Sequence, residues 1–475
     1  MYLLSLIPIV IAFAVIMKTK RAFESCILGI LSAILLYSFQ TGDWNIPVLF
    51  YNFLAETSGS PGNMWVIIFT LAIGPVTQIL DDAGATRAFT NWVTRKFANN
   101  DKKSLLSIII LGIVVYADEF LKAAVLDSYG KTIGKKNRLP VETVGTMILA
   151  LGIPLVSWIP MATWSVYFVQ LMEGSGFTQN GTADFITKVM PQMFFPMILT
   201  VIVVLFALGV IPALGGIKTA QQKVATGTYD FSVYGSQEVD TSAGATKAGP
   251  WDFVIPLAAL LALGIYYAGD LAIACLVIIV FEMAWFLARR LMTFPALMDS
   301  FWKGMFSTFR PTVYLMVGFT FTTVLKLIGF PELIQAISGI LVPGAVLAFF
   351  FVAATAIGTL TGMFWPATSM FMAACLPVTE QMGISPFLLS AVLFSAATLG
   401  TVISPRGALV MFVGEELNSN PVDLTRNARP YALIAGGLTL VLYLIIGFIV
   451  VCSRDISRKE RPYYEQQYLP VRRGI

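Results

Sequence analysis

The sequence predicts an all-α polytopic membrane protein made of two inverted repeats, each with five spans and one re-entrant hairpin, with broken helices at the centre. Composition is the first observation: 57% of the 475 residues are hydrophobic and 12% are charged, about half the charged share of soluble domains. The second is that apolar stretches of about 20 residues, long enough to cross a bilayer, recur from end to end. The third is similarity between the two halves.

The first repeat comprises residues 1–212, and one of its segments does not fit a simple helix. That segment, 143–171, contains Gly152, Pro154 and Pro160. An interior proline removes a hydrogen bond and clashes with the preceding turn, so we predict a broken helix. The five expected spans lie at 2–17, 22–39, 64–80, 143–171 and 194–212.

A second irregular segment, at about 105–134, has charged residues near its middle, in the stretch YADEF. About 30 residues with charges at the centre exceed one simple apolar crossing. We predict a re-entrant hairpin with its tip near mid-membrane, which is tolerated only where protein surrounds it.

The second repeat, 251–452, follows a linker at 213–250 that is expected on the cytoplasmic side. The linker is rich in Gly, Ala, Ser and Thr and shows no periodicity. Residues 453–475 form a basic tail. The five expected spans of the second repeat lie at 251–267, 271–288, 312–328, 387–414 and 431–452.

The second hairpin is expected at about 344–380, where GTLTGMFWPATS interrupts a long charge-free run. The second broken helix is expected at 387–414, which contains Gly400, Pro405 and Gly407. Two hairpin tips and two broken helices at similar depth would expose unpaired backbone groups around one cavity. Helix N-termini there attract anions, and carbonyl ends attract cations.

Matching segments indicate the repeats. IPVLFYNFL at Ile46 resembles FPALMDSFW at Phe294, about 248 residues later, and VSWIP resembles TVISP. Five crossings are an odd number, so the second repeat runs through the membrane upside down, as in many secondary transporters. The basic loops KTKR and KKNR then share one side, which the positive-inside rule makes cytoplasmic. Ten crossings put the basic tail outside, so the side of the tail stays open.

Composition also excludes several classes of protein. The chain has no histidine, so any transported proton must use Asp, Glu, Lys or water. The four cysteines lie far apart in apolar segments without metal-ligand spacing. Without a phosphate-binding loop or a nucleophile motif, we expect no enzyme activity, no cofactor and no nucleic-acid partner. The expected partners are the lipid bilayer and a small solute or ion.

Asp118, Glu119 and Lys122 lie at the expected tip of the first hairpin. A charge at mid-membrane costs at least about 2.5–3.5 kcal/mol. Three interpretations stay open: a cytoplasmic loop, a structural Glu119–Lys122 ion pair, or a binding site for an ion or substrate. Two adjacent acids could take up a proton or Na⁺, so we consider both Asp118 and Glu119 candidate ligands for the coupling ion.

The run from Tyr116 to Trp164 resembles the NhaC-type Na⁺/H⁺ antiporter family of the ion transporter superfamily. Members have paired acids at the positions of Asp118 and Glu119, a basic stretch like KKNR and a small-residue stretch like GIPLVSWIPMATW. The resemblance implies a secondary transporter driven by ion gradients, a homodimer, and a multi-pass location in the bacterial inner membrane. Relatives include Na⁺/H⁺ antiporters, organic-acid exchangers and amino-acid carriers.

The second repeat diverges from that family. The stretch LGTVISPRGALV has Arg406 and no acid where members usually have acidic residues, and GMFWPATSM lacks the usual Gly-Thr-Ser pattern. Cationic Lys122 and Arg406 suit a solute carboxylate, which Arg can bind bidentately. Equally open are an ion pair of Arg406 with Asp118 or Glu119, and a snorkelling position.

Glu282 lies inside a span and is a second candidate proton carrier, with a structural pair to Lys326 as the alternative. Trp158 is expected to line the cavity or to pack. The remaining candidate substrate-binding residues carry hydroxyl groups. They are Ser157, Thr163, Thr368, Ser369, Thr401 and Ser404.

Two hypotheses for function follow. The first is Na⁺- or H⁺-coupled carriage or exchange of a small organic acid or amino acid by alternating access, with Arg406 or Lys122 near the solute carboxylate. The second is Na⁺/H⁺ antiport, in which Asp118 and Glu119 alternately bind Na⁺ and H⁺. A passive channel is a third class, disfavoured by inverted repeats with two hairpins. The solute, the coupling ion, its stoichiometry and the direction of exchange are left open.

Overall fold

The computed structural model describes residues 2–19, 22–97, 100–115, 119–160, 162–234, 247–267, 270–372, 378–379 and 382–465. Every regular element within these residues is a helix, which agrees with the predicted helical class. By length and composition, six described helices could cross a membrane, or up to eight if each of two bent pairs is one span. The predicted count of ten spans stays a prediction.

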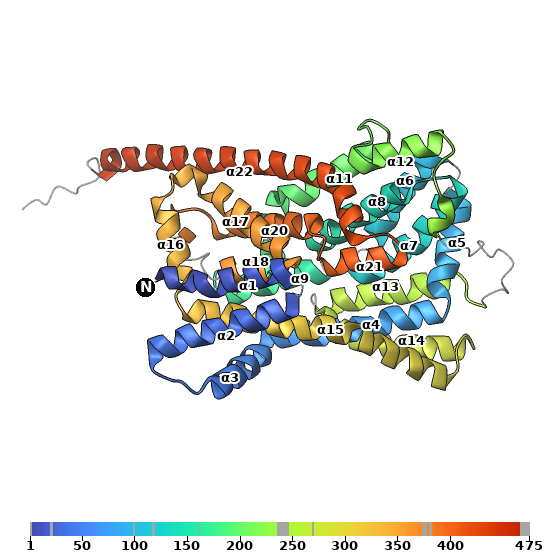
Figure 1. The fold of residues 1–475 in the computed structure, drawn as a ribbon, viewed down its shortest axis with the longest axis horizontal. Coiled ribbons are helices and arrows are strands. Elements are labelled where there is room, and N and C mark those ends of the chain that lie inside the picture. The colour runs from blue at the N-terminus through green and yellow to red at the C-terminus, as the bar shows by residue number, and fades with distance from the viewer. Residues whose placement is uncertain are drawn as a thin grey trace, which may run out of the picture.

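The helices form two layers that run along the long axis of the molecule (Figure 1). One layer, called here the α4–α15 layer, contains the N-terminal helices and three helices from the middle of the chain. Its members are α1 (Leu6–Thr19), α2 (Ala22–Thr41), α3 (Ile46–Gly59), α4 (Pro61–Asp82), α13 (Trp251–Tyr266), α14 (Leu271–Ala288) and α15 (Phe294–Leu327).

The second layer, called here the α8–α20 layer, contains the helices with the predicted interruptions (Figure 1). Its members are α6 (Asp101–Val114), α7 (Glu119–Lys136), α8 (Val141–Trp158), α9 (Thr163–Gly174), α11 (Phe194–Ala207), α17 (Val346–Thr361), α18 (Phe364–Met372), α20 (Pro386–Ile403), α21 (Ala408–Glu416) and α22 (Pro421–Glu465).

Helices α4 and α15 cross at two glycines. A Cβ atom on Gly74 would lie 2.2 Å from the Gly304 carbonyl oxygen, and one on Gly304 would lie 2.4 Å from the Gly74 oxygen. Small residues allow such close backbone approach between membrane helices. Asp82 at the end of α4 accepts a hydrogen bond from Ser300 of α15 at 2.8 Å. The predicted span 312–328 is therefore the second half of a 34-residue helix.

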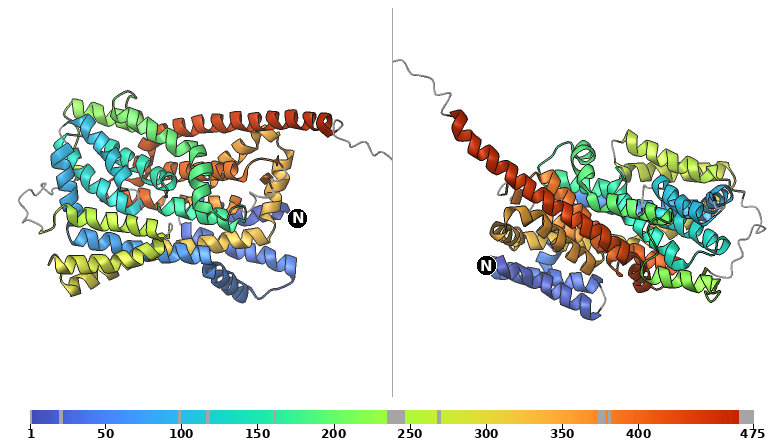
Figure 2. Two further views of the ribbon diagram at one scale, coloured as in Figure 1. Left: turned by 180° about the vertical axis from the view of Figure 1, so that it is seen from behind. Right: turned by 90° about the horizontal axis from the view of Figure 1, so that it is seen from above.

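Two short helices connect the layers at opposite ends of the molecule. Helix α5 (Ala85–Phe97) follows α4, and α16 (Phe330–Ile340) follows α15. Both run across the direction of the long helices, as Figures 1 and 2 show. Gly84 (φ 76°) and Gly329 (φ 92°) make the sharp turns before them, in a region that favours glycine.

The linker is more ordered than the sequence predicted. It contains α12 (Gly215–Ala225) and the short helix η4 (Phe231–Tyr234). The Tyr229 hydroxyl donates to Glu142 at the start of α8 at 2.7 Å, and Tyr234 donates to the Leu139 carbonyl at 2.8 Å. Burial and then the bond to Glu142 raise the pKa of Tyr229 above its ordinary value. The linker thus holds the connection between α7 and α8.

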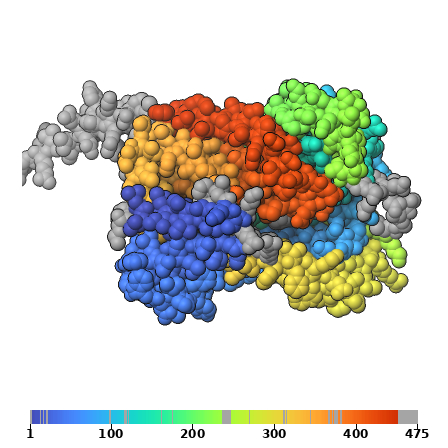
Figure 3. All heavy atoms as spheres, viewed as in Figure 1, coloured from blue at the N-terminus to red at the C-terminus, as the bar shows by residue number. Residues whose placement is uncertain are grey.

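The outer surface exposes large apolar side chains, whereas some charged side chains are buried. Val280 of α14 is 67% exposed and Ile449 of α22 is 60% exposed; the space-filling view shows these regions on opposite margins, in yellow and red (Figure 3). Glu282 and Lys122 are fully buried. Soluble proteins rarely expose such contiguous apolar surface, so the chain is an integral membrane protein with several spans. Helix α22 continues to Glu465, past the predicted end of its span at 452.

Candidate functional site

Both predicted broken helices are interrupted next to a proline. Helix α8 ends at Trp158 and α9 begins at Thr163, around Pro160. Helix α20 ends at Ile403 and α21 begins at Ala408, around Pro405. Pro154, by contrast, lies inside α8. The interruptions leave helix ends, with their unpaired backbone groups, inside the α8–α20 layer.

The two interrupted helices contact each other near their breaks. The hydroxyl oxygens of Ser157 in α8 and Thr398 in α20 lie 3.3 Å apart. Both side chains are buried. Ser157, a predicted site residue of the first half, therefore lies beside the broken helix of the second half.

The turn between α17 and α18 packs against the break of α20 and α21. Gly362 forms the turn with φ 72°, and a Cβ atom there would lie 2.7 Å from the Arg406 carbonyl carbon. The α17 and α20 backbones also approach closely, because a Cβ on Gly400 would lie 2.6 Å from the Thr355 oxygen. The predicted second hairpin region is thus fixed by close backbone contact.

The α6–α7 pair brings its charges against α8. Glu119 begins α7 and is 4% exposed, while Lys122 is fully buried. The Lys122 ammonium lies 3.5 Å from the carbonyl oxygens of Leu151 and Gly152. A carboxylate in the first turn of a helix is favoured by the helix dipole. Asp118 lies outside the described residues.

Arg406 contacts the end of a helix. Its guanidinium donates to the Leu360 carbonyl of α17 at 3.1 Å, and its backbone N–H points at the Ser404 hydroxyl at 3.4 Å. A cation at a helix C-terminus is favoured by the dipole and by the unpaired carbonyls there. Arg406 therefore stabilises the α17–α18 turn.

The predicted hydroxyl residues are buried, and several bond to their own helices. Ser157 donates to the Pro154 carbonyl at 2.9 Å, Thr368 to Phe364 at 3.0 Å and Thr401 to Ala397 at 2.9 Å. A hydroxyl that bonds the preceding turn has used its donor. The predicted hydroxyl residues that the structure buries are Ser157, Thr163, Thr368, Ser369, Thr401 and Ser404.

A smaller polar cluster joins α9, α15 and α18. The hydroxyls of Ser369 and Thr322 lie 3.3 Å apart. The Tyr167 hydroxyl lies near Thr368 and Ser369, but it makes no well-formed hydrogen bond with the described residues. The Trp164 ring packs edge-on against Phe364, with 4.1 Å between ring centroids. This cluster is where the two layers meet.

The segment between α9 and α11 approaches the α8–α9 break. It folds as α10 (Gly181–Asp184), the π-helical turn η2 (Phe185–Val189) and η3 (Met190–Gln192). The Trp158 indole donates to the Met190 carbonyl at 3.1 Å, so Trp158 is a packing anchor in this structure.

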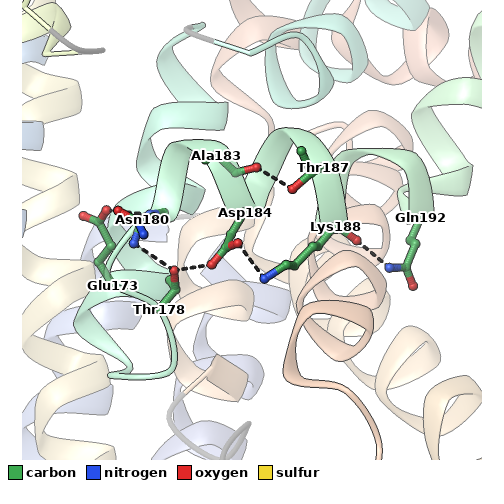
Figure 4. Close-up of polar contacts among 9 residues, drawn as sticks. Glu173, Thr178, Asn180, Ala183, Asp184, Thr187, Lys188 and Gln192 are labelled. Carbon is green, nitrogen blue, oxygen red and sulfur yellow. Dashed lines mark hydrogen bonds and ion pairs between the residues drawn. The ribbon is translucent and has the colours of Figure 1, made fainter.

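Ion-pair and hydroxyl contacts hold the same segment in shape (Figure 4). Lys188 pairs with Asp184 at 2.7 Å, and Thr178 donates to the same carboxylate at 2.6 Å. The Lys188 ammonium also lies 4.4 Å from the Phe387 ring centroid of α20. These contacts hold the segment that follows α9 against α20.

Glu282 is not brought to the breaks. It lies on α14 in the α4–α15 layer, is fully buried, and neither carboxylate oxygen has a hydrogen-bond partner in the part of the chain that the structure describes. The alternative of a pair with Lys326 is therefore not seen there. Glu282 stays a candidate proton carrier, separate from α7.

Asp127 was missed by the sequence-based selection of sites. It is fully buried in α7, and both of its carboxylate oxygens lack a hydrogen-bond partner among the described residues. The available signal was its position, eight residues after Glu119, in the apolar stretch AAVLDSYG. No group of three or more His, Cys, Asp or Glu side chains suited to a metal occurs among the described residues.

Comparison with known proteins agrees with this geometry. Residues 155–448, more than half of the chain, match the model of the Na⁺/H⁺ antiporter family. A Haemophilus influenzae protein described as uncharacterized is 22% identical over 178 residues, which is 36% of this chain and 33% of that protein. The chain thus spans about a third of that relative's length.

A solved structure has a similar fold. The Alcanivorax borkumensis YdaH transporter superposes with a TM-score of 0.54 over 86% of this chain and 90% of that chain. The two sequences are 14% identical, so the similarity concerns the fold alone.

Proposed function

We propose, from the premise that the chain belongs to the Na⁺/H⁺ antiporter family, that it exchanges Na⁺ for H⁺ across the cytoplasmic membrane by alternating access. The family membership confirms the resemblance seen in the sequence, and we infer from it that the chain is a secondary transporter. The observation that carries the proposal is the nearly complete burial of the Glu119 carboxyl at the start of α7, beside an interrupted helix pair.

Glu119 and its neighbour Asp118 are the proposed ligands for Na⁺. Their carboxylate oxygens are the kind of ligand that a hard cation such as Na⁺ prefers. Backbone carbonyls at the helix ends would supply further oxygen ligands for Na⁺, as in other carriers with broken helices. Binding of Na⁺ there would then oppose binding of the proton, and binding of the proton would oppose binding of Na⁺.

The basic residues favour this proposal over carriage of an organic acid. Arg406 donates to the Leu360 carbonyl, and Lys122 lies against two carbonyls of α8. Both cations thus have protein oxygens beside them, and several hydroxyls have used their donors within their own helices. Carriage of a carboxylate or amino acid is the second hypothesis, and it predicts no proton flux with a Na⁺ gradient alone.

The arrangement of repeats is part of the proposal. Each half has an α-helix interrupted near a proline and a pair of short helices beside it, α6–α7 in the first half and α17–α18 in the second. Two inverted repeats with re-entrant hairpins would produce this pattern, and alternating access would then move one layer against the other.

The test uses purified protein in liposomes that enclose a pH-sensitive dye. An inward Na⁺ gradient alone should produce proton efflux in the wild type, and Glu119→Gln should remove it. Glu415→Gln, an exposed acid on α21, is the matched control and should keep the wild-type rate. Equal rates in wild type and Glu119→Gln would refute the role of Glu119.

A further inference from the structure

Asp127 is a buried acid that the exchange site at the start of α7 does not use. Its side chain is fully buried, and neither carboxylate oxygen has a hydrogen-bond partner among the described residues. Helix α7 packs there against α5, α6, α8, α21 and η4. An ionised carboxyl without a partner is among the costliest groups to bury. The site therefore needs a bound positive charge.

The neighbouring charges do not supply that positive charge. Among the described residues, two charged groups act on Asp127: Glu416 at the end of α21, and Lys131, one turn later on α7. These two pair with each other at 2.7 Å, from the ammonium nitrogen to a carboxylate oxygen. Because their opposite charges lie side by side, their fields at Asp127 largely cancel.

A proton fits Asp127 better than a metal cation does. A hard cation needs several oxygen ligands, whereas α7 is an unbroken helix from Glu119 to Lys136. Its backbone carbonyls near Asp127 are used in helical hydrogen bonds. A proton needs only one carboxyl oxygen.

We propose that Asp127 is a proton-binding site, separate from the Na⁺-binding acids at the start of α7, and that it carries the proton exchanged for Na⁺. This inference rests on the proposed exchange function. Eight residues separate Asp127 from Glu119, about 12 Å along a helix at 1.5 Å per residue. The two sites interact through the electric field along α7.

The field is strong enough for coupling. Two unit charges about 12 Å apart at an effective dielectric constant of about 20 change each other's binding by about tenfold. Na⁺ arriving beside Glu119 thus promotes release of the proton from Asp127, and protonation of Asp127 promotes release of Na⁺. Coupling of this kind is reciprocal by thermodynamic linkage.

The Lys131–Glu416 pair offers the proton a route to solvent. Its side chains are 31% and 45% exposed, and it lies one turn from Asp127. The pair also joins α7 to α21, so the exit of the proton lies between a helix of the first half and a helix of the second.

The first test is infrared spectroscopy of the full-length protein at neutral pH without Na⁺. The wild type should show the C=O band of a protonated carboxylic acid, which weakens on addition of Na⁺. Asp127→Asn should lack that band, and the control Glu415→Gln should keep it. A Na⁺-sensitive band that persists in Asp127→Asn would overturn the proposal.

The second test separates two transport modes in liposomes. Asp127→Asn should keep exchange of labelled Na⁺ for Na⁺ within about twofold and lose Na⁺/H⁺ exchange at least about tenfold, the size of the coupling. Loss of both modes, or retention of both, would contradict the proposal. Asparagine is close in shape to a protonated Asp, so the variant should fold.

If Asp127→Asn does not elute as a folded protein, Glu416→Gln provides the test without altering Asp127. Lys131 then faces Asp127 without its counter-charge, and the infrared titration midpoint should move to lower pH. An unmoved midpoint would overturn the proposal. A wild type that has the Asp127 band but no Na⁺-driven proton flux would refute the exchange function and leave the proton site intact.

Discussion

Two helix pairs of the α8–α20 layer, α6–α7 and α17–α18, have similar architecture but different chemistry. The α6–α7 pair places Glu119, Lys122 and Asp127 in the interior. The α17–α18 pair has no charged residue in its sequence and presents hydroxyls such as Thr368. Each pair lies against an interrupted helix, α8 or α20. Both pairs are thus buried beside a broken helix, but only the α6–α7 pair carries charged side chains that could bind ions.

The second pair is held by shape. Its turn at Gly362 adopts φ 72°, and Gly400 lets the α20 backbone approach α17. Among the described contacts of this turn, Arg406 is the charged residue. Its guanidinium donates to the Leu360 carbonyl of α17. We expect substitutions in this pair to affect folding more than exchange.

Replacement of Glu119 should have the largest effect. Glu119→Gln should lower Na⁺/H⁺ exchange by at least about 100-fold, about 2.7 kcal/mol, because the carboxylate is a proposed ligand. Thr368→Val, the counterpart in α18, should lower the rate by less than about fivefold, within 1 kcal/mol. Rates come from dye-loaded liposomes. Equal losses in the two variants would remove the difference between the pairs.

Gly362→Ala should have the largest effect on folding in the second pair. The added Cβ would lie 2.7 Å from backbone of Arg406, and overpacking together with a positive φ costs about 1–3 kcal/mol. The thermal midpoint in detergent should fall. Gly437→Ala, where nothing lies within 4 Å of the new Cβ, is the control. Equal midpoints for both variants would show that the turn tolerates a side chain.

Arg406→Ala should lower stability with little effect on exchange. Loss of a charge-assisted hydrogen bond to a helix carbonyl costs about 1–3 kcal/mol, and Arg406→Lys should restore part of it. Thermal midpoints and exchange rates in the same preparations measure both effects. A variant with wild-type stability and no transport would instead assign Arg406 to the transported solute or ion.

Ser369→Ala should have the smallest effect. It removes a hydroxyl 3.3 Å from Thr322, a contact worth about 0.5–1.5 kcal/mol. Exchange should stay within about twofold of the wild type, since the proposed ligands are on α7. Loss of Na⁺ exchange in Ser369→Ala would place ion binding in the α17–α18 pair and would contradict its assignment to the α6–α7 pair.

The sequence predicted the helix interruptions well because proline acts directly on the backbone: it removes a helical hydrogen bond and clashes with the preceding turn. Pro160 and Pro405 mark both broken helices. The similarity of the segments at Ile46 and Phe294 also predicted a shared element, since both segments begin helices. It did not predict that α3 ends at Gly59 whereas α15 continues for 34 residues. The stretch SGSPG ends the first helix, and the second has no such break.

The chemistry of the site was harder to predict than its location. Sequence patterns identified Glu119 and Lys122 as charges within an apolar segment, with a cytoplasmic loop as one open alternative, and the structure buries both side chains. They left Arg406 open between a solute carboxylate, an ion pair and a snorkelling position, because the Leu360 carbonyl that it contacts lies 46 residues away in sequence. They passed over Asp127, since its burial depends on how α7 packs against elements from both halves of the chain, such as α8 and α21. The order in the linker depends likewise on long-range contacts such as Tyr229 with Glu142.

The most direct test of the central claim, that the ions exchange on α7, is proton release on Na⁺ binding. Purified protein in weakly buffered detergent solution receives Na⁺, and a pH indicator reports protons released. The account predicts release by the wild type and by Thr368→Val, and none by Glu119→Gln. Undiminished release by Glu119→Gln, or its loss in Thr368→Val alone, would contradict the account.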